Sequence, residues 1–207
     1  MARESDEVPG LDLTAMDGYD SGATAMLPTD SLLFEEAAES EPRRWHLGAD
    51  LGLFVLRAVV GVVVGAHGMQ HLFGSFSGPG ITGFTEFLGK SGYANTTVLA
   101  YLTGWTELVG GGFLLLGLLT PLAAAGLLGV LANAVYLKYS GGLFAAHGGY
   151  ELELVLAAAA LSLLFTGPGR WALDNGRSWY RKAGASGTIG LLLAAGATVL
   201  VFVFGRR

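Results

Sequence analysis

Long apolar runs, separated by short polar or glycine-rich segments, make up most of the chain after an acidic N-terminal stretch. Such runs predict membrane-spanning helices, because a helix needs about 20 apolar residues to cross the hydrocarbon core. The five predicted spans are Ala49–Met69, Val98–Leu119, Leu122–Leu137, Glu151–Thr166 and Gly187–Phe204. The third and fourth runs are short by this measure, so we expect them to include flanking residues. The pattern predicts an all-α membrane protein.

The connection between the first two runs carries its own helical pattern. Ile81, Phe84, Phe87 and Leu88 recur at helical spacing within it. This spacing predicts a short helix with one apolar face, of the kind that lies in a membrane interface.

The first 44 residues differ in character from the apolar runs. Twelve of the seventeen Asp and Glu residues fall within the first fifty positions, where proline and glycine also recur. Such a segment cannot bury enough apolar surface to offset its ordering entropy, so we predict a disordered acidic tail over residues 1–44. The predicted organisation is this tail, a four-helix membrane domain over residues 45–175, and a linker with a fifth membrane helix over residues 176–207.

Basic residues predict the orientation in the membrane. With five spans, the side of the N-terminal tail carries seven Lys and Arg residues and the other side carries four. Positive charges concentrate on the cytoplasmic side of membrane proteins. We therefore predict a multi-pass protein with a cytoplasmic N-terminus and an external C-terminus.

The composition excludes several kinds of chemistry. The chain has no cysteine, which rules out disulfides, thiolate catalysis and cysteine-ligated metal sites. No Walker loop, GxSxG sequence or dinucleotide fingerprint is present, and the glycine runs lie in or beside the spans. The basic residues flank the spans and form no nucleic-acid patch. No signature of a soluble enzyme follows from the sequence.

Two ionisable residues, Arg57 and Glu107, lie well inside the first and second runs. A charge in hydrocarbon costs at least about 2.5 kcal/mol, so each needs a partner or a function. Each shares a helix face with glycines such as Gly61 and Gly111, which let a neighbouring helix approach closely. Counted from the span ends, both reach mid-bilayer, which predicts an Arg57–Glu107 ion pair. Such a pair is a structural lock between helices or the floor of a substrate, quinone or proton site; the third alternative is that the two do not meet.

Polar residues also gather where the predicted topology makes one end of the bundle. The first run ends with His67, Gln70 and His71, and the fourth begins with Glu151 and Glu153. Of the two glutamates, Glu151 shares its face with small residues and is predicted to point inward. The cluster is either a hydrogen-bonded polar rim or a place for proton exchange or quinone head-group binding, since histidine titrates near neutral pH.

The third run contributes Asn133, on a face with glycines, and Tyr136 one turn further on. Asparagine in a span usually hydrogen-bonds a neighbouring helix, so packing and ligand contact are alternatives for Asn133. No metal site is predicted, because the HGMQH sequence lacks the internal glutamate of HExxH. Haem is a further alternative, and it would need His67 or His71 together with His147.

Several sequence features together resemble the DoxX family over about residues 50–175. They are Arg57 and the His67-Gly68 dipeptide, the ELVGG sequence of Glu107–Gly111 followed by GLLTP, and GPGRWALD over Gly167–Asp174. The resemblance implies a four-helix membrane fold in a bacterial plasma membrane. The family takes its name from a subunit of an archaeal thiosulfate:quinone oxidoreductase, and some members are linked to oxidative or thiol stress with partner proteins. It therefore implies a quinone-linked or redox-accessory role.

We therefore expect a redox-associated membrane subunit that binds quinone or supports a partner oxidoreductase in a membrane complex. The expected ligand-binding residues are Arg57, His67, Gln70, His71, Glu107, Asn133, Tyr136 and Glu151. Two alternatives belong to other classes. One is a non-catalytic accessory or assembly subunit of a respiratory complex that docks through the N-terminal tail, and the other is a small proton-coupled transporter. The expected partners are the lipid bilayer and a protein of the same complex, with no nucleic acid.

Overall fold

The computed structural model describes residues 47–176 and 183–206, which belong to one compact unit of the chain, Trp45–Arg207. The described residues form helices and connecting turns, as the hydrophobic pattern predicts. The long helices are α2 (Leu47–Phe73), α4 (Thr96–Leu116), α5 (Thr120–Lys138), α6 (Glu151–Thr166) and α8 (Ala183–Gly205). The acidic tail predicted for residues 1–44 lies outside the described residues.

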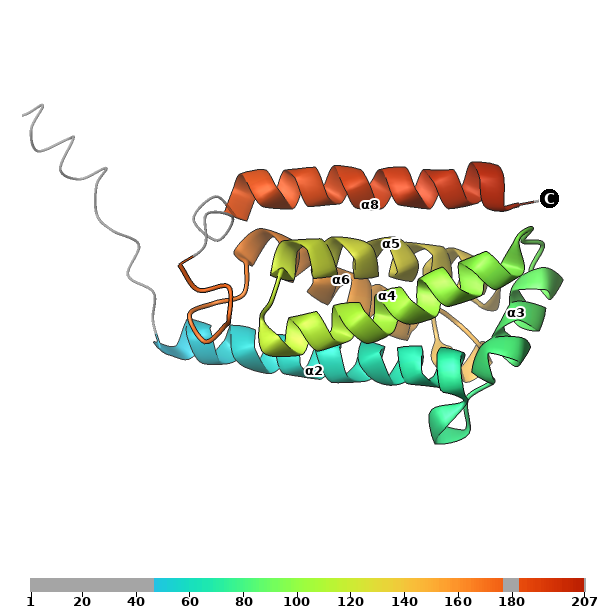
Figure 1. Cartoon of the computed structure of the whole chain (residues 1–207), viewed down its shortest axis with the longest axis horizontal. Coiled ribbons are helices and arrows are strands. Elements are labelled where there is room, and N and C mark those ends of the chain that lie inside the picture. The colour runs from blue at the N-terminus through green and yellow to red at the C-terminus, as the bar shows by residue number, and fades with distance from the viewer. Residues whose placement is uncertain (1–46, 177–182, 207) are drawn as a thin grey trace, which may run out of the picture. The chain divides into compact units, whose positions relative to one another are not determined.

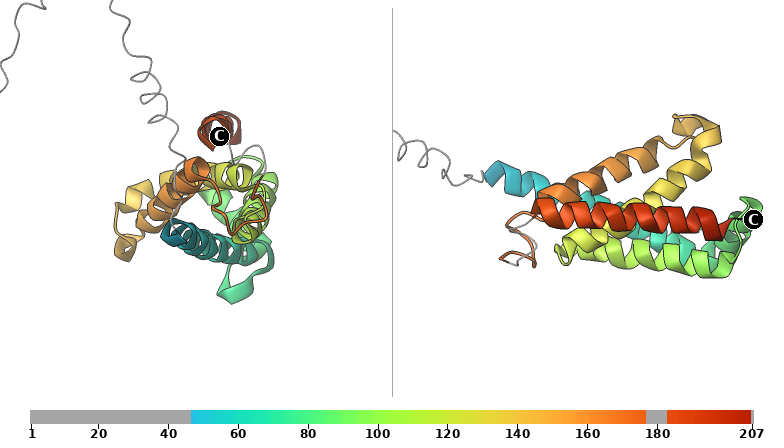
Figure 2. Two further views of the ribbon diagram at one scale, coloured as in Figure 1. Left: turned by 90° about the vertical axis from the view of Figure 1, so that its left-hand side faces the viewer. Right: turned by 90° about the horizontal axis from the view of Figure 1, so that it is seen from above.

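The long helices run in alternating directions, with α2, α5 and α8 parallel to one another and α4 and α6 running back between them (Figures 1 and 2). Two ends of the bundle follow from this arrangement. We call one the clamp end; it contains residues 47–57, 114–121 and 167–176. We call the other the cavity end; it contains residues 67–107, 133–153 and 198–206.

Glycines set the close contact between α2 and α4. A Cβ atom added at Gly61 would lie 2.6 Å from the carbonyl oxygen of Gly111, and one at Gly68 would lie 2.5 Å from the nitrogen of Leu108. Real Cβ atoms do not approach so closely, so the two backbones touch directly at both levels. The glycine faces predicted for the first two spans are therefore confirmed as the interface between them.

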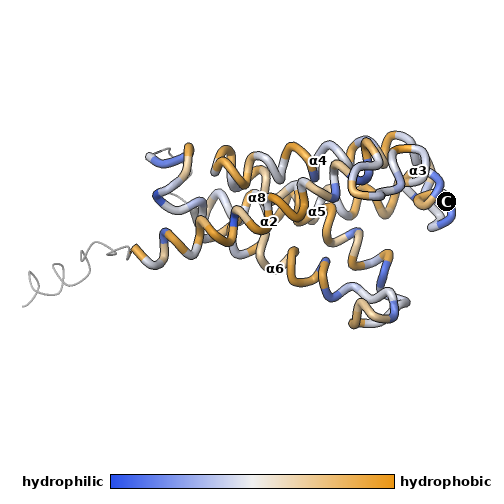
Figure 3. Tube along the Cα trace, turned by 90° about the horizontal axis from the view of Figure 1, so that it is seen from below, coloured by the Kyte–Doolittle hydropathy of each residue, from blue (hydrophilic) through white to orange (hydrophobic). Residues whose placement is uncertain are grey.

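Four helical segments among the described residues are long and apolar enough to cross a membrane: Leu47–Phe73, Thr96–Leu116, Thr120–Gly141 and Gly184–Gly205. Their apolar character is visible along the chain trace (Figure 3). Large apolar side chains such as Val62 and Leu192 are exposed on their outer faces, as lipid contact requires. The protein is therefore a multi-pass helical membrane protein.

The first, third and fifth helices extend a few residues beyond their predicted spans, and the second and fourth spans differ in other ways. The second span ends at Leu116 instead of Leu119, because Gly117 takes a φ of 67° and stops the helix. The fourth, α6, matches its predicted limits but has only 16 residues and is shorter than the four segments above. The expectation that the fourth run borrows flanking residues is wrong; the third does extend, from Thr120 to Lys138.

Two apolar clusters hold the helices together. The larger one joins α2, α4, α5 and α6, with Leu114, Leu127 and Leu163 fully buried in it. The smaller one joins Phe84 and Leu88 of α3 (Gly80–Lys90) to residues of the following loop and of α4. The short helix predicted between the first two spans is therefore confirmed, and its apolar face packs against the bundle.

The fifth long helix, α8, is an integral part of the bundle. It packs on α5 and α6 through small residues, and a Cβ added at Gly187 would lie 2.9 Å from the carbonyl oxygen of Leu164. Its end is tied to the α3–α4 loop, where Ala94 donates a main-chain hydrogen bond to Gly205 at 2.6 Å. Both ends of α8 are therefore anchored to the bundle, and the helix packs along α5 between them.

Candidate functional site

Arg57 lies at the clamp end, where it is 1% exposed. Its guanidinium donates hydrogen bonds to two main-chain carbonyls, from Nη2 to Trp171 at 2.6 Å and from Nη1 to Leu114 at 3.3 Å. The predicted Arg57–Glu107 ion pair is therefore wrong. The reason is the register of α2 against α4, which places Arg57 beside Gly117. Glu107 precedes Gly117 by about 15 Å of helix.

The GPGRWALD segment closes the clamp end. Asp174 accepts a hydrogen bond at Oδ2 from the main-chain nitrogen of Thr120, at 2.9 Å, where α5 begins. Asp50 likewise accepts one at Oδ1 from the nitrogen of Arg170, at 2.9 Å. Carboxylates in such positions satisfy main-chain amides that have no helical partner. Arg57 thus has a structural role, with main-chain carbonyls as its partners.

Glu107 pairs with His71 at the cavity end. The two side chains lie 2.7 Å apart, from Oε2 to Nδ1, and Glu107 is 7% exposed. The His71 ring stacks on Phe84, with ring centroids 3.9 Å apart and planes 7° from parallel. With a carboxylate at Nδ1, that nitrogen carries the proton and Nε2 of the neutral ring is left as an acceptor. The result is an oriented acid–base pair inside the bundle.

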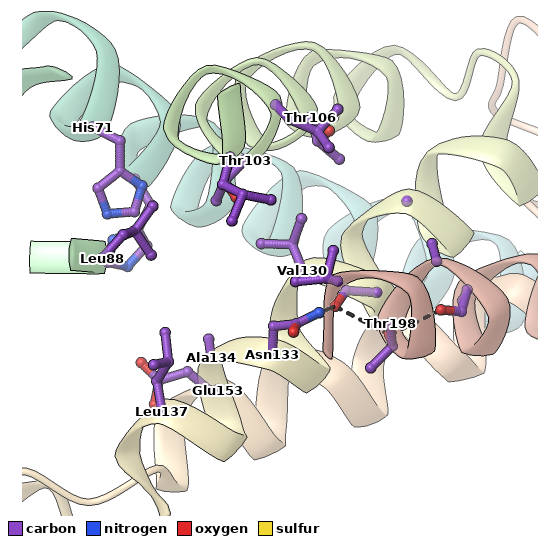
Figure 4. Close-up of a pocket in the computed structure, with 18 of the residues that line it drawn as sticks. His71, Leu88, Thr103, Thr106, Val130, Asn133, Ala134, Leu137, Glu153 and Thr198 are labelled. Atoms are coloured by element: carbon purple, nitrogen blue, oxygen red, sulfur yellow. Dashed lines mark hydrogen bonds between the residues drawn. The ribbon is translucent and has the colours of Figure 1, made fainter. Parts of the chain in front are cut away.

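A cavity of about 510 Å³ lies beside this pair, lined mainly by α4, α5 and α8. Along α5 its lining runs from Leu122 to Lys138, which is about 24 Å at the helical rise. Most lining side chains are apolar. The polar and ionisable ones are His67, His71, Tyr93, Thr103, Thr106, Asn133, Lys138, Glu153 and Thr198, all from the cavity end. Figure 4 shows His71 and Glu153 on opposite sides of this space. An elongated apolar cavity with polar groups toward one end suits an amphipathic ligand.

Only some of the predicted site residues line the cavity. His67, His71 and Asn133 line the cavity, whereas Gln70 and Tyr136 do not. The Gln70 amide donates to a nearby carbonyl at 3.4 Å, and the Tyr136 hydroxyl is bonded to Arg206 at the end of α8. Tyr136 therefore serves the attachment of α8.

Glu153, and not Glu151, is the glutamate that α6 turns inward. Glu153 is 8% exposed, lines the cavity and lies 2.5 Å from the ammonium of Lys138. The inward prediction for Glu151 is wrong, because the buried stripe of α6 continues from Glu153 through Leu156 and Ala160. The small residues that share a face with Glu151 lie on the exposed side, where lipid accepts them as readily as a protein interior does.

Three threonines that line the cavity were not among the predicted site residues. Thr103 and Thr106 lie three residues apart on α4, a spacing of one helix face that the sequence shows. Thr198 gains its place only when α8 packs on α5. There its hydroxyl lies 3.5 Å from the carbonyl of Gly129, which also accepts a hydrogen bond from Asn133.

The haem and metal alternatives can be set against the same geometry. His147 lies in a short helix of the α5–α6 connection and is exposed, and it does not line the cavity with His67 and His71. Within residues 47–176 and 183–206, no group of three or more His, Cys, Asp or Glu residues could hold a metal ion.

These features define a class: a multi-pass helical membrane protein with an apolar interhelical cavity and a partly buried His–Glu pair at its polar end. The DoxX family model matches residues 52–148. An uncharacterized membrane protein of Mycobacterium tuberculosis, Rv3486, is 33% identical over 150 residues, which cover 67% of this chain and 89% of that protein. The chain belongs to the DoxX family, as its sequence motifs predict. No solved structure matches it significantly.

Proposed function

We propose that this protein is a redox-associated membrane subunit that binds a quinone in the cavity between α4, α5 and α8. The observation that carries the proposal is the His71–Glu107 pair at the polar end of an otherwise apolar cavity. A membrane quinone has a ring with two oxygens and a long apolar tail. The ring fits the polar end of the cavity, and the tail fits the apolar lining that extends toward Leu122.

The His71–Glu107 pair supports proton exchange with such a ligand. Reduction of a quinone by two electrons takes up two protons, and oxidation of the quinol releases them. Glu107 holds the His71 ring in one tautomer and stabilises the imidazolium that forms when Nε2 takes a proton. Phe84 keeps the ring in its plane by stacking on it. We assign the electron transfer itself to a partner oxidoreductase.

Binding of quinone by the purified full-length protein tests the proposal. Glu107→Gln keeps the shape of the side chain but removes the charge that fixes the tautomer of His71. We expect the wild type to retain quinone from native membranes and the variant to bind a short-tailed quinol about tenfold more weakly, because Nε2 of His71 is no longer held as an acceptor for its hydroxyl.

Glu86→Gln is the matched control, since Glu86 pairs with Lys90 on an exposed face of α3 and should leave the affinity unchanged. The proposal is contradicted if the wild type holds no quinone at native lipid content and takes up none when it is added.

We also propose that the N-terminus lies in the cytoplasm of a bacterial cell and the cavity end on the external side. The support is the excess of basic residues, seven against four, on the N-terminal side. Because the chain has no cysteine, single cysteines at the exposed positions Ser140 and Asn175 report the two sides separately. We expect a membrane-impermeant maleimide to label Ser140→Cys in intact cells and Asn175→Cys only after permeabilisation. The reverse pattern would invert the orientation.

The partner is proposed to dock on the acidic segment, residues 1–44. This segment carries eleven of the seventeen acidic residues, a charge that suits a basic surface on a partner protein. Deletion of residues 1–44 should abolish co-purification with that partner while membrane insertion stays intact. Unchanged co-purification would contradict docking through this segment.

A further inference from the structure

Six buried side-chain polar atoms in the described part of the chain have no hydrogen-bond partner within the protein. They form two sets of three. The clamp end holds Arg57 Nε, Thr120 Oγ1 and Asp174 Oδ1, and the cavity end holds Tyr93 Oη, Asn133 Oδ1 and Glu153 Oε2. Buried polar atoms without a partner are rare in folded proteins, and each calls for a physical explanation.

The clamp set contains complementary groups. Arg57 Nε donates a hydrogen bond, Asp174 Oδ1 accepts one, and the Thr120 hydroxyl can do both. One buried water is enough to satisfy a set that holds both donors and acceptors, since such a water typically makes about three hydrogen bonds. The clamp set therefore gives no reason to expect a ligand.

The cavity set has a different balance of hydrogen-bond donors and acceptors, and all three of its residues line the cavity. The side-chain nitrogen of Asn133 donates to the carbonyl of Gly129 at 2.9 Å. Because a carbonyl oxygen only accepts hydrogen bonds, this bond fixes the orientation of the Asn133 side-chain amide. The oxygen of Asn133 is therefore an acceptor without a donor.

Glu153 adds a second acceptor of the same kind. Its Oε1 is engaged by the ammonium of Lys138, and its Oε2 is buried with no donor in reach. Thr198 adds a third, because its hydroxyl donates to the carbonyl of Ala194 at 2.8 Å and keeps only its lone pairs for other partners. In the tautomer that donates from Nδ1 to Glu107, His71 adds a fourth through Nε2.

Groups that only donate are few around the same space, and His67, Thr103 and Thr106, which also line it, can each donate or accept. Lys138 is half exposed, and its ammonium already faces Glu153. Burial raises the pKa of Tyr93, with Arg206 opposing it as the weaker effect, so the phenol keeps its proton and can donate or accept. Its hydroxyl nevertheless bonds neither Asn133 nor Glu153. Among the groups whose hydrogen-bonding direction the structure fixes, the free ones are therefore acceptors, and the polar end of the cavity is complementary to a ligand that donates.

We propose that the cavity selects the quinol over the quinone, an inference that rests on the proposed function and specifies its ligand. A quinol carries two hydroxyl groups that can donate to acceptors such as Asn133 Oδ1 and Glu153 Oε2. A quinone carries two carbonyls, which only accept and would leave these oxygens unpaired. Sites built to hydrogen-bond a hydroxyl reject an analogue that lacks the matching group far more strongly than apolar pockets reject a change of size.

Three probes of nearly one shape test this selectivity. They are a decyl-substituted 1,4-benzoquinol, the corresponding benzoquinone, and the 1,4-dimethyl ether of the quinol. Affinities are measured anaerobically on the full-length protein in quinone-free lipid nanodiscs. We expect the quinol to bind at least about tenfold more tightly than either of the others. The ether is decisive because it keeps the ring and tail but cannot donate.

The outcomes separate the two proposals. If the quinone or the ether binds as tightly as the quinol, the selectivity is overturned while quinone binding in the cavity stands. If none of the three probes binds, the proposed function is itself overturned, and the selectivity falls with it.

Two variants assign the selectivity to particular atoms. In Glu153→Gln the side-chain oxygen keeps the contact with Lys138, so an NH₂ donor replaces Oε2. The ratio of quinol affinity to quinone affinity should then fall to about one or reverse. Asn133→Leu should lower the preference by removing the second acceptor. Glu151→Gln is the matched control, because the structure places Glu151 outside the cavity lining.

Retention of the full quinol preference in both Glu153→Gln and Asn133→Leu would overturn the assignment, as would its loss in Glu151→Gln. Thermal unfolding of each variant confirms that it is folded. Glu153→Gln changes no side-chain volume of consequence, so it keeps the test available if Asn133→Leu does not fold.

Discussion

The two ends of this bundle treat buried charge in different ways. At the clamp end, Arg57 is enclosed by main-chain carbonyls of Leu114 and Trp171, and its contacts join three segments of the chain. At the cavity end, Glu107 holds only one nitrogen of His71, and the ring borders a cavity. An ionisable residue within a membrane is therefore not by itself evidence of a reactive site. Such a residue is evidence of a reactive site only when its polar partners leave one hydrogen-bonding atom of the group free to face a cavity that a ligand can enter.

The largest expected effect on stability is at the clamp end. Arg57→Met removes both carbonyl contacts and the positive charge that acts on buried Asp174. Breaking a buried charged network of this kind costs about 3–5 kcal/mol. The free energy of unfolding in mixed micelles measures the loss.

Arg170→Met is the control, because its side chain is exposed and the change should stay within about 0.5 kcal/mol. If Arg57→Met is as stable as the wild type, Arg57 has no structural role at the clamp end. The two ends then do not differ in how they use buried charge.

A smaller loss is expected for Gly117→Ala at the same end. The added Cβ would collide with Nη1 of Arg57 and lie 2.5 Å from the Cβ of Ala172, and Gly117 has a φ of 67° that favours glycine. Strain of this kind costs about 1–3 kcal/mol in the free energy of unfolding. Quinol affinity should stay unchanged, since no contact reaches the cavity.

Gly112→Ala is the matched control within α4, where nothing lies within 4 Å of the added atom. Alanine is the better helix former, so this variant should be as stable as the wild type or more stable by up to about 1 kcal/mol. Equal losses for the two substitutions would mean that α4 itself, and not the clamp end, is sensitive.

The smallest effect on stability, with a large effect on binding, is expected at the cavity end. Ala134→Phe places a ring in the cavity that Ala134 lines, and should lower the affinity for the short-tailed quinol at least about tenfold. The free energy of unfolding should change by less than about 1 kcal/mol, because the ring fills existing space. Ala158→Phe, on the exposed face of α6, should leave the affinity unchanged. Wild-type binding by Ala134→Phe would place the ligand elsewhere.

The number and order of the helices could be predicted from the sequence because both depend on local properties. A run of apolar residues becomes a helix in a membrane regardless of its neighbours, since every main-chain polar group must be satisfied within the segment. The glycine faces of α2 and α4 were also predictable, because close approach requires residues without a Cβ on both sides. Gly61 and Gly111 meet as that argument requires.

The partners of the charged residues could not be predicted in the same way. A pairing of Arg57 with Glu107 assumed that equal distances from the span ends mean equal depth. The glycine contacts instead set a register in which Arg57 lies beside Gly117 and Glu107 beside His71. The choice between Glu151 and Glu153 failed for a related reason. Lipid and protein interior are equally apolar, so the hydrophobic pattern of α6 does not reveal which face is buried.

The sequence by itself therefore determined the class of protein, its family, its helices and the identity of the residues that need polar partners. Each of these depends on composition within a single segment or on a motif of fixed spacing. Only the tertiary structure decided that Arg57 belongs to a structural clamp and that His71, Asn133 and Glu153 share one cavity with α8. Those assignments depend on register and rotation between helices, which are set by contacts among residues far apart in the chain.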